Sequence, residues 1–431
     1  MNGVIRLRSF CVLLSLVFPL LLAGPQGRVL AQPDEKSVGW PQFLGPHRNG
    51  ISDEKGLLKE WPAAGPKVVW RVAGGVGMSG LAIRDNRVVS MIQRDGKQWV
   101  ICLEKKSGAT IWQTPVAPAY KNGMGNGPRA TPTISGDQVA VFTGEGILAS
   151  LNVADGRILW SRDLTTELQG TIADYGMACS PLVIGSLVVV TTGAPGAAIV
   201  ACDVASGRIQ WKSGDDAAGY SSPALLEISG QKQLVVYTGQ AAVGLVPQSG
   251  AELWRYPFVT NFDCNIATPI AVNNHVLISS GENHGAVLLA LKKSGTHWTV
   301  SETWQSLGAQ SVLRNEWQTS IASDGYLYGF DNVGAAGPVT HLTCVKAATG
   351  ERVWQKTRFG KGNMIAADGK LFASTMNGDL VVVKLSPDSY QEIGRTQLTG
   401  PTRQAPALSE GFIYLRDNEE IVCVDVRETS E

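Results

Sequence analysis

The sequence predicts an all-β protein, an eight-bladed β-propeller made of four-stranded antiparallel blades. A glycine followed four residues later by a tryptophan recurs along the chain, at Gly108/Trp112, Gly156/Trp160, Gly207/Trp211, Gly250/Trp254 and Gly350/Trp354. With Trp304 included, these tryptophans recur about every 50 residues, and a regular period of that length is typical of repeat architectures. The composition agrees, because 49 glycines and 12 tryptophans in 431 residues suit short strands, tight turns and large buried aromatic rings.

One repeat shows how a blade is expected to be built. Between Ala130 and Trp160 the apolar runs predict strands at 130–134, 138–143 and 147–153, followed by a fourth strand that carries Trp160. The dipeptide Asp155-Gly156 suits a tight hairpin turn, because glycine adopts a positive φ at little cost. Four antiparallel strands in each repeat describe one propeller blade.

The number of blades follows from the outermost strands. Their tryptophans are Trp70, Trp112, Trp160, Trp211, Trp254, Trp304 and Trp354, and a degenerate eighth position lies near Ile393. The strand at 68–70 has no strand before it, whereas residues 406–426 supply inner strands with no tryptophan strand after them. We expect these two fragments to pair and close the ring, which covers edges that otherwise invite aggregation. The alternative, an open solenoid, would leave both end blades uncovered.

The N-terminal 31 residues are predicted to be a signal peptide. Arg6 and Arg8 precede an apolar run at 11–23 that is short for a membrane span, and Val29-Leu30-Ala31 offers a small-residue cleavage site before Gln32. A retained membrane anchor is the alternative. Since no later stretch is apolar enough to span a membrane, we expect the mature protein to be extracytoplasmic, either periplasmic or secreted.

Residues 32–66 show no period and are predicted to form an irregular extension before the propeller at 67–431. Trp40 and Trp61 are its aromatic anchors, and we expect them to hold the segment over the propeller surface. A disordered linker is the alternative.

Charge and motifs exclude several functions. The 37 basic residues balance the 37 acidic ones, so no basic excess exists to bind nucleic acid. The run Gly75–Gly80 matches a dinucleotide-binding pattern, but strand-turn-strand follows it where a helix is needed. The five histidines are widely spaced and predict no metal site. The six cysteines after the signal peptide lie in separate strand positions, and we expect them to be free thiols.

The blade pattern resembles the PQQ-like, or quinoprotein-type, repeat family. The pattern is a small residue, an acidic residue two positions later, then Ser/Thr-Gly and Trp, as in Cys102, Glu104, Ser107, Gly108 and Trp112 or Ala201, Asp203, Ser206, Gly207 and Trp211. Elsewhere it degenerates, since Lys346 replaces the acid after Cys344, and the last blade keeps only Cys423 and Asp425. Members of this family include BamB-like propeller proteins of outer-membrane assembly and larger dehydrogenases that use pyrroloquinoline quinone (PQQ). The repeat therefore implies the fold but fixes no activity.

Propeller geometry predicts where a binding site would lie. The loops that connect one blade to the innermost strand of the next emerge on the same face as the loops between second and third strands. The candidate ligand- or partner-binding residues on the first set are Arg129, Tyr175, Tyr220, Asp263, Asn265, Arg314, Glu316, Trp317, Lys361, Asn363 and Arg403. The second set adds Glu145, Glu282, Asn283, His284 and Asp331. A rim of mixed charge around the axis indicates a binding funnel, or else a solvated loop surface without a dedicated ligand.

The first functional prediction is a non-catalytic binding or assembly scaffold, monomeric, that presents this rim to a protein or polymer partner in the cell envelope. No cofactor is expected. The alternative is a PQQ-dependent oxidoreductase with calcium, and a hydrolase or lyase on the same rim is a third possibility. The resemblance implies that such dehydrogenases hold the quinone between a tryptophan and a disulfide of adjacent cysteines, beside a calcium bound by Glu and Asn. Trp317 is placed to stack, and Glu316 or Asp263 with Asn265 to bind calcium, but the sequence has no adjacent cysteine pair.

Overall fold

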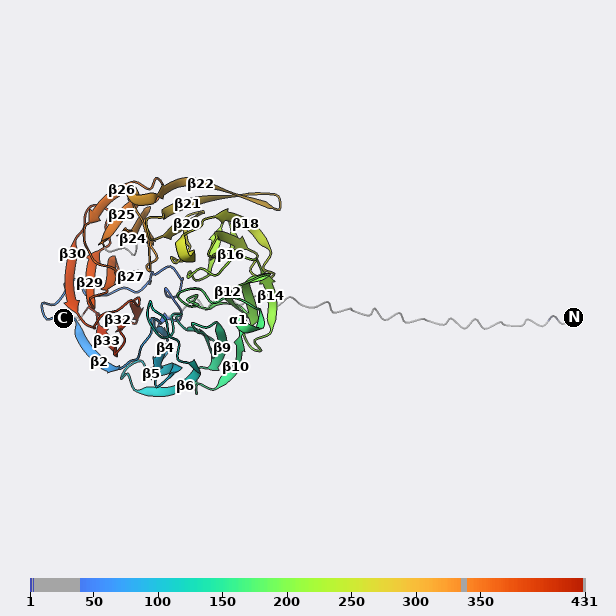
Figure 1. The fold of residues 1–431 in the computed structure, drawn as a ribbon, viewed down its shortest axis with the longest axis horizontal. Helices are drawn as coiled ribbons and strands as arrows, with labels where there is room; N and C mark the ends of the chain where they lie inside the picture. Colours follow the sequence, from blue (N-terminus) through green and yellow to red (C-terminus); the bar gives the residue numbers. More distant parts are fainter. Residues whose placement is uncertain (2, 4–38, 335–338, 429–431) are drawn as a thin grey trace. The chain divides into compact units, whose positions relative to one another are not determined.

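The computed structural model describes residues 39–334 and 339–428, together with Met1 and Gly3. The chain divides into two units, 1–35 and 36–431. The predicted signal peptide and the start of the extension lie outside the described residues, apart from Met1 and Gly3. The second unit is an eight-bladed β-propeller, so the predicted fold class is confirmed (Figure 1).

The first four blades follow one another around the axis. They consist of β3 (Ala82–Arg84), β4 (Arg87–Arg94), β5 (Lys97–Glu104) and β6 (Thr110–Pro118); β7 (Thr133–Ser135), β8 (Gln138–Phe142), β9 (Ile147–Asn152) and β10 (Ile158–Asp163); β11 (Leu182–Ile184), β12 (Leu187–Ala194), β13 (Ala197–Asp203) and β14 (Ile209–Ser213); and β15 (Ala224–Ile228), β16 (Gln231–Tyr237), β17 (Ala241–Leu245) and β18 (Glu252–Pro257). The one-turn helix α1 (Leu164–Glu167) follows β10.

Blades five to seven repeat the same order from the innermost to the outermost strand. They consist of β19 (Ile270–Val272), β20 (His275–Ser280), β21 (Gly285–Ser294) and β22 (His297–Leu307); β23 (Ile321–Ser323), β24 (Tyr326–Val333), β25 (Val339–Lys346) and β26 (Arg352–Lys356); and β27 (Gly362–Ala367), β28 (Lys370–Thr375), β29 (Asp379–Lys384) and β30 (Glu392–Gln397). Two 3-10 turns, η1 (Asn261–Asp263) and η2 (Gly308–Gln310), precede blades five and six.

The eighth blade closes the ring with strands from both ends of the chain. It combines β31 (Ala407–Ser409), β32 (Phe412–Arg416) and β33 (Glu420–Asp425) with the early strand β2 (Lys67–Ala73). Strand β2 pairs antiparallel with β33, in a register that sets Trp70 opposite Cys423. The predicted closure is therefore confirmed, and β2 (light blue) lies beside β33 (dark red) in Figure 1.

The repeated glycine and tryptophan contact each other between blades. The indole Nε1–H of Trp160 donates to the carbonyl oxygen of Val204 in the next blade at 2.7 Å, and Trp70, Trp112, Trp211, Trp304 and Trp354 make the equivalent bond. The glycine of the next hairpin turn rests on the same ring, since a Cβ at Gly207 would lie 2.7 Å from Trp160. Gly207 also has a φ of 70°, which favours glycine. The glycine and the tryptophan recur in the sequence because, in each pair of neighbouring blades, the tryptophan of one blade packs against the glycine turn of the next.

Two blades depart from this contact. The hairpin after Trp254 is long, and its indole donates instead to Gln233 Oε1 in its own blade at 2.6 Å. In blade seven the register places Gly394, next to the predicted degenerate position at Ile393, where other blades carry tryptophan. Trp61 of the extension packs onto Gly394 and donates its Nε1–H to Thr396 Oγ1 at 2.9 Å. The extension therefore supplies the tryptophan that this blade lacks.

The extension also enters the centre of the ring, which differs from the surface position expected for it. Strand β1 (Gly39–Trp40) pairs with β3, the innermost strand of blade one, and Ser52 N–H donates to Ala366 O of blade seven at 2.9 Å. Trp40 is 2% and Leu44 3% exposed. The axial space of a propeller takes such a segment because innermost strands leave unpaired edges there. Residues 39–52 form an axial plug, the blue trace at the centre of Figure 1.

All six cysteines of the described residues are buried and free. We expect protein lacking residues 1–31 to titrate with six thiols when denatured without reductant. In the native state the thiols should react slowly, because burial raises the pKa of Cys102 and Cys423 to about 12 and that of Cys202 to about 11. A thiol-specific dye measured before and after denaturation tests both statements. Four or fewer thiols in the denatured protein would contradict the structure.

Candidate functional site

A belt of small hydroxyl side chains links neighbouring blades at the start of the innermost strands. Backbone N–H groups donate to a hydroxyl in the next blade from Gly80 to Thr131, from Thr131 to Ser180, from Ser180 to Ser222 and from Thr268 to Thr319, at 2.9–3.0 Å. A proline follows Thr131, Ser180, Ser222 and Thr268. Because proline offers no N–H, it suits the first position of a strand. These hydroxyls, which we call the hydroxyl belt, lie near the axis at four of the eight blade junctions, on the face that carries the connecting loops.

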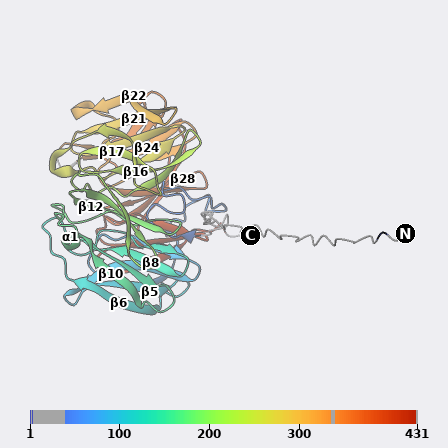
Figure 2. The same cartoon turned by 90° about the vertical axis from the view of Figure 1, so that its right-hand side faces the viewer.

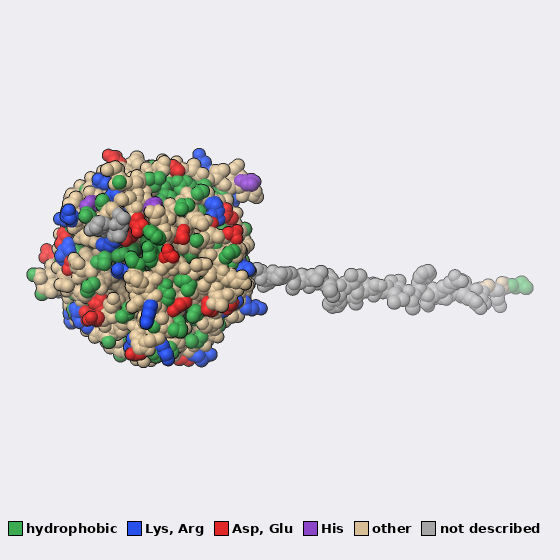
Figure 3. Space-filling view, viewed as in Figure 1, with side chains coloured by type: hydrophobic (Ala, Val, Ile, Leu, Met, Phe, Trp, Pro, Cys, Tyr) green, Lys and Arg blue, Asp and Glu red, His purple; other side chains and the backbone are tan. Residues whose placement is uncertain are grey.

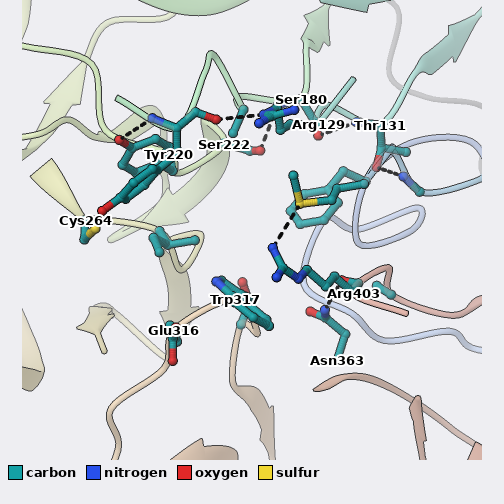
Figure 4. Close-up of a pocket in the computed structure, with 18 of the residues that line it drawn as sticks. Arg129, Thr131, Ser180, Tyr220, Ser222, Cys264, Glu316, Trp317, Asn363 and Arg403 are labelled. Carbon is teal, nitrogen blue, oxygen red and sulfur yellow. Dashed lines mark hydrogen bonds between the residues drawn. The ribbon is translucent and has the colours of Figure 1, made fainter. Parts of the chain in front are cut away.

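A cavity of about 200 Å³ opens on this face, above the belt (Figure 4). Phe43 of the axial plug lines it from the centre of the ring, and Thr131, Ser180, Ser222 and Thr319 of the belt line it from the blades. The plug approaches from the opposite side, since in Figure 2 the blue trace lies to the right of the ring and α1 of a connecting loop to the left. The ring is therefore a cup with a base supplied by the extension.

Aromatic side chains flank the cavity. Tyr175 and Tyr220 stack with ring centroids 5.5 Å apart, and Tyr175 also contacts Phe262 at 6.5 Å. Trp317 lies across from Tyr220 in Figure 4. Burial raises the pKa of the Tyr220 hydroxyl well above its usual value, so this group stays protonated at any physiological pH.

Two arginines line the cavity in different environments. Arg129 is 8% exposed and donates to three backbone carbonyl oxygens, those of Tyr175, Gly127 and Gly125. Arg403 is half-buried, donates to Met124 O at 2.6 Å and places its Cζ 4.8 Å from the Trp317 ring centroid. Arg129 therefore holds loops together, whereas Arg403 presents a guanidinium to the cavity.

The two glutamates at the cavity also differ in their environment, since one is ion-paired and the other is not. Glu316 is 7% exposed, and the Lys361 ammonium lies 2.8 Å from its Oε1 and 2.7 Å from its Oε2. Lys361 Nζ also lies 4.3 Å from the Trp317 ring centroid. Glu282 is half-buried and lines the cavity without an ion pair to any described residue. Glu316 is thus neutralised in place, because a buried carboxylate is costly unless paired.

A third arginine lies directly beneath the belt. Arg48 of the axial plug is 4% exposed and donates to the carbonyl oxygens of Ser180 at 2.5 Å, Pro181 at 3.2 Å and Pro223 at 2.6 Å. Its fourth partner is the amide oxygen of Gln42, and no carboxylate among the described residues contacts it. Burial lowers the pKa of Arg48 to about 10, which leaves the guanidinium charged at neutral pH. The plug therefore brings an uncompensated positive charge to the axis.

The structure brings about half of the predicted site residues to the cavity. Those that line it are Arg129, Tyr175, Tyr220, Glu282, Glu316, Trp317, Asn363 and Arg403, and Lys361 joins them through Glu316. Asp263, Asn265, Arg314, Glu145 and His284 do not line it. Their polar atoms serve the loops instead: the Asn265 amide donates to Thr238 O and Phe258 O, and Arg314 forms a buried ion pair with Asp331 at 2.6 Å.

Sequence reasoning missed the small and apolar part of the cavity. Met78, Met124, Cys264, Phe43 and the belt hydroxyls line it but carry no strong chemical signature. One pattern would have found the belt, because Thr-Pro or Ser-Pro recurs at 131–132, 180–181, 222–223 and 268–269. Each pair precedes an innermost strand.

Exposed apolar side chains gather on the same face. Val76, Met124, Ile172, Val259, Phe262 and Leu307 all lie on or at the start of connecting loops, and Val259 and Phe262 are 69% and 60% exposed. The other large exposed apolar residues of the described chain, apart from Met1, lie on outermost strands. We call these six residues the apolar rim. Figure 3 views the molecule from this face and shows green apolar side chains around its centre.

Two structural features are absent from the described residues. No group of three or more His, Cys, Asp or Glu side chains within residues 39–334 and 339–428 is arranged to hold a metal ion. Within the same residues, no helix has the length and hydropathy needed to cross a membrane.

The fold and its cup-shaped centre define a PQQ-like repeat propeller. The family model described as "Outer membrane protein assembly factor BamB" matches residues 96–356 and 338–429. The chain belongs to this BamB, or PQQ_2, family.

Individual relatives are distant. The chain is 26% identical over 265 residues to the outer membrane protein assembly factor BamB of Nitrosomonas eutropha, a match that covers 56% of this chain and 56% of that protein. The chain thus spans about half the length of this curated relative. The BamB crystal structure from Moraxella catarrhalis matches with a TM-score of 0.57 at 14% identity, over 84% of this chain and 99% of that one. Quinohemoprotein alcohol dehydrogenase from Comamonas testosteroni matches with a TM-score of 0.65 at 11% identity, over 91% and 81%. Both structural matches show the fold alone.

Proposed function

We propose that this protein is a non-catalytic assembly scaffold of the cell envelope, exported and monomeric, that binds a protein partner through the face bearing the cavity. The observation that carries the proposal is the apolar rim, six exposed apolar side chains on the connecting loops of one face. Its most exposed members, Val259 and Phe262, are close in the chain, and the Phe262 ring contacts Tyr175 of the cavity wall. An exposed apolar patch that is continuous with a cavity marks an interaction surface. The BamB relatives, named for outer membrane protein assembly, support the choice of compartment and of a protein as partner.

The residues do not fit the alternative, a PQQ-dependent oxidoreductase. The sequence has no adjacent cysteine pair to hold a quinone against Trp317. Of the side chains considered for calcium, Glu316 is paired with Lys361, the Asn265 amide is bonded to backbone carbonyls, and Asp263 does not line the cavity. We therefore propose that the protein needs neither PQQ nor calcium.

Affinity capture from cell envelopes tests the scaffold proposal. The double variant Val259→Ser, Phe262→Ser should lose most of the partner that the wild-type protein retains, because it removes the two most exposed side chains of the rim. The matched control, Ile111→Ser with Val353→Ser, changes apolar residues of similar type on outermost strands and should retain the partner. Equal capture by both double variants would contradict the proposed face.

The same preparation tests the competing function. Titration with PQQ in the presence of calcium, followed by absorbance and by reduction of an electron-acceptor dye with alcohols, should show no stoichiometric binding. Binding near one equivalent at micromolar concentration or tighter would replace the scaffold proposal with an oxidoreductase.

A further inference from the structure

Four buried hydroxyl groups line the cavity with their hydrogens uncommitted. Thr131, Ser180, Ser222 and Thr319 are 2–5% exposed, and the Oγ of each accepts a backbone N–H from the preceding blade. Within the part of the chain that the structure describes, none of these hydroxyls donates a hydrogen bond to a protein atom. A hydroxyl has one donor hydrogen besides its acceptor lone pairs. The belt therefore offers four O–H donors to whatever enters the cavity.

The charges around these donors favour an anion. Arg403 presents its guanidinium at the cavity wall. Arg48 lies beneath the belt and donates to the carbonyl oxygens of Ser180, a belt residue, and of Pro223, which follows the belt residue Ser222. Arg129 adds a third positive charge on the same side as Ser180 and Ser222 in Figure 4. On the Cys264 side of the cavity the carboxylates of Glu282, Glu316, Asp263 and Asp174 act in the opposite sense, and Lys361 neutralises Glu316. The three guanidinium groups thus lie beneath the belt and along the Arg129–Arg403 side of the cavity, and an anion bound there would be held by charge-assisted hydrogen bonds, which are the strong ones.

The apolar surface around the cavity indicates which kind of molecule the anionic group belongs to. The apolar rim lies on the connecting loops around the opening, and the cavity walls add Tyr175, Tyr220, Trp317 and Met78. A free inorganic anion would leave all this apolar surface exposed to water. A protein loop with an acidic tip and apolar flanks satisfies both parts, since interfaces commonly combine a central desolvated anchor with a ring of contacts that excludes water.

We propose that the cavity receives the carboxylate of an aspartate or glutamate at the tip of a partner protein's loop, while the apolar rim packs against the loop's apolar flanks. This inference rests on the proposed function and adds the chemistry of the partner. The carboxylate oxygens accept hydrogen bonds from the belt hydroxyls and from the free N–H groups of Arg403. The tyrosine and tryptophan walls contact the aliphatic part of the acidic side chain and its neighbours.

A pair of cyclic peptides tests this inference without knowledge of the natural partner. The peptides are identical except that the turn displays Leu-Asp-Leu in one and Leu-Asn-Leu in the other. Calorimetric titration of the full propeller should give a dissociation constant below about 1 mM for the Asp peptide and at least about tenfold weaker binding for the Asn peptide. Added salt should narrow the difference, because salt screens a charge pair at a partly open site.

Variants of the protein identify the contacts. Arg403→Met removes the charge while keeping the length of the side chain, and Ser222→Ala removes one belt donor; each should weaken the Asp peptide about fivefold or more and leave the Asn peptide nearly unchanged. Arg208→Met removes an equal charge from an exposed hairpin on the opposite face and should change neither. Thermal melting shows whether Ser222→Ala, which also loses a bond to Ser180 N–H, still folds. Arg403→Met gives a second test that does not touch the belt.

The outcomes separate this inference from the proposed function. Equal affinity for the two peptides, no binding of the Asp peptide below about 1 mM, or indifference of Asp-peptide binding to Arg403→Met would each overturn the carboxylate site. If the carboxylate site is rejected but capture of the partner from cell envelopes still depends on Val259 and Phe262, the scaffold proposal remains valid without the carboxylate site. Selective binding of the Asp peptide together with failed envelope capture would support the site and reject the scaffold role.

Discussion

Removal of residues 32–73 should lower the free energy of unfolding by several kcal/mol and leave a protein that melts broadly and aggregates. The deletion takes away β2, which pairs with β33 along its length, and so bares a strand edge of the last blade. It also removes the axial plug, where Trp40, Leu44 and Arg48 are 2–4% exposed, and Trp61, which fills the tryptophan position of blade seven. Each loss exposes apolar surface or leaves carbonyl oxygens of the innermost strands without donors.

Complementation distinguishes lost closure from a general folding defect. A synthetic peptide of residues 39–76, added to the truncated protein, should restore a sharp melting transition, because it carries β1, the plug, Trp61 and β2. A peptide in which Trp61 and Trp70 are alanine is the matched control and should restore much less. An unchanged melting curve for the truncated protein alone would mean that the ring does not depend on this closure.

The sequence predicted the fold because one inter-blade contact is repeated around the ring. The indole Nε1–H of the tryptophan requires a carbonyl acceptor, and its ring packs closely only against a residue without a side chain. Where the hairpin of the next blade is short, its glycine turn provides both contacts. Strand ends were less accurate: the innermost strand expected at 130–134 is β7, Thr133–Ser135. Residues 130–132 belong to the hydroxyl belt instead, and Pro132 cannot donate to a ladder.

The face that carries the cavity was predictable from the sequence, but the residues that line the cavity were only partly predictable. Loop geometry placed the candidates on the face that carries the cavity, yet polar residues such as Arg314 and Asn265 use their hydrogen bonds to hold neighbouring loops and strands. The partner that neutralises Glu316 is Lys361, 45 residues away, so no local pattern shows which charges remain available. Phe43 and Arg48 reach the site from an extension without any period. The position of this extension is set by contacts with residues far away in the sequence, so no local sequence pattern predicts it.

Replacement of Trp211 by alanine should cost about 3–5 kcal/mol of unfolding free energy, the usual range for truncating a buried aromatic side chain. Trp211 is 7% exposed, packs between blades three and four with Val243 and Leu245, and donates to Pro247 O at 3.1 Å. The exposed neighbour on the same strand, Gln210→Ala, is the control and should change stability by less than about 0.5 kcal/mol.

A double-mutant cycle then tests whether the glycine-tryptophan motif is the contact that joins these two blades. A Cβ at Gly250 would overlap the Trp211 ring, so Gly250→Ala should destabilise the wild-type protein both by this clash and by its φ of 69°. In the Trp211→Ala background the clash is gone and only the backbone cost of about 1–2 kcal/mol remains. Gly250→Ala should therefore cost less there than in the wild type, by a coupling that chemical denaturation measures. If the changes in unfolding free energy from the two substitutions were strictly additive, the Trp211 ring and the Gly250 turn would not stabilise each other. Substitutions of residues in direct contact give non-additive changes, whereas those of distant residues add.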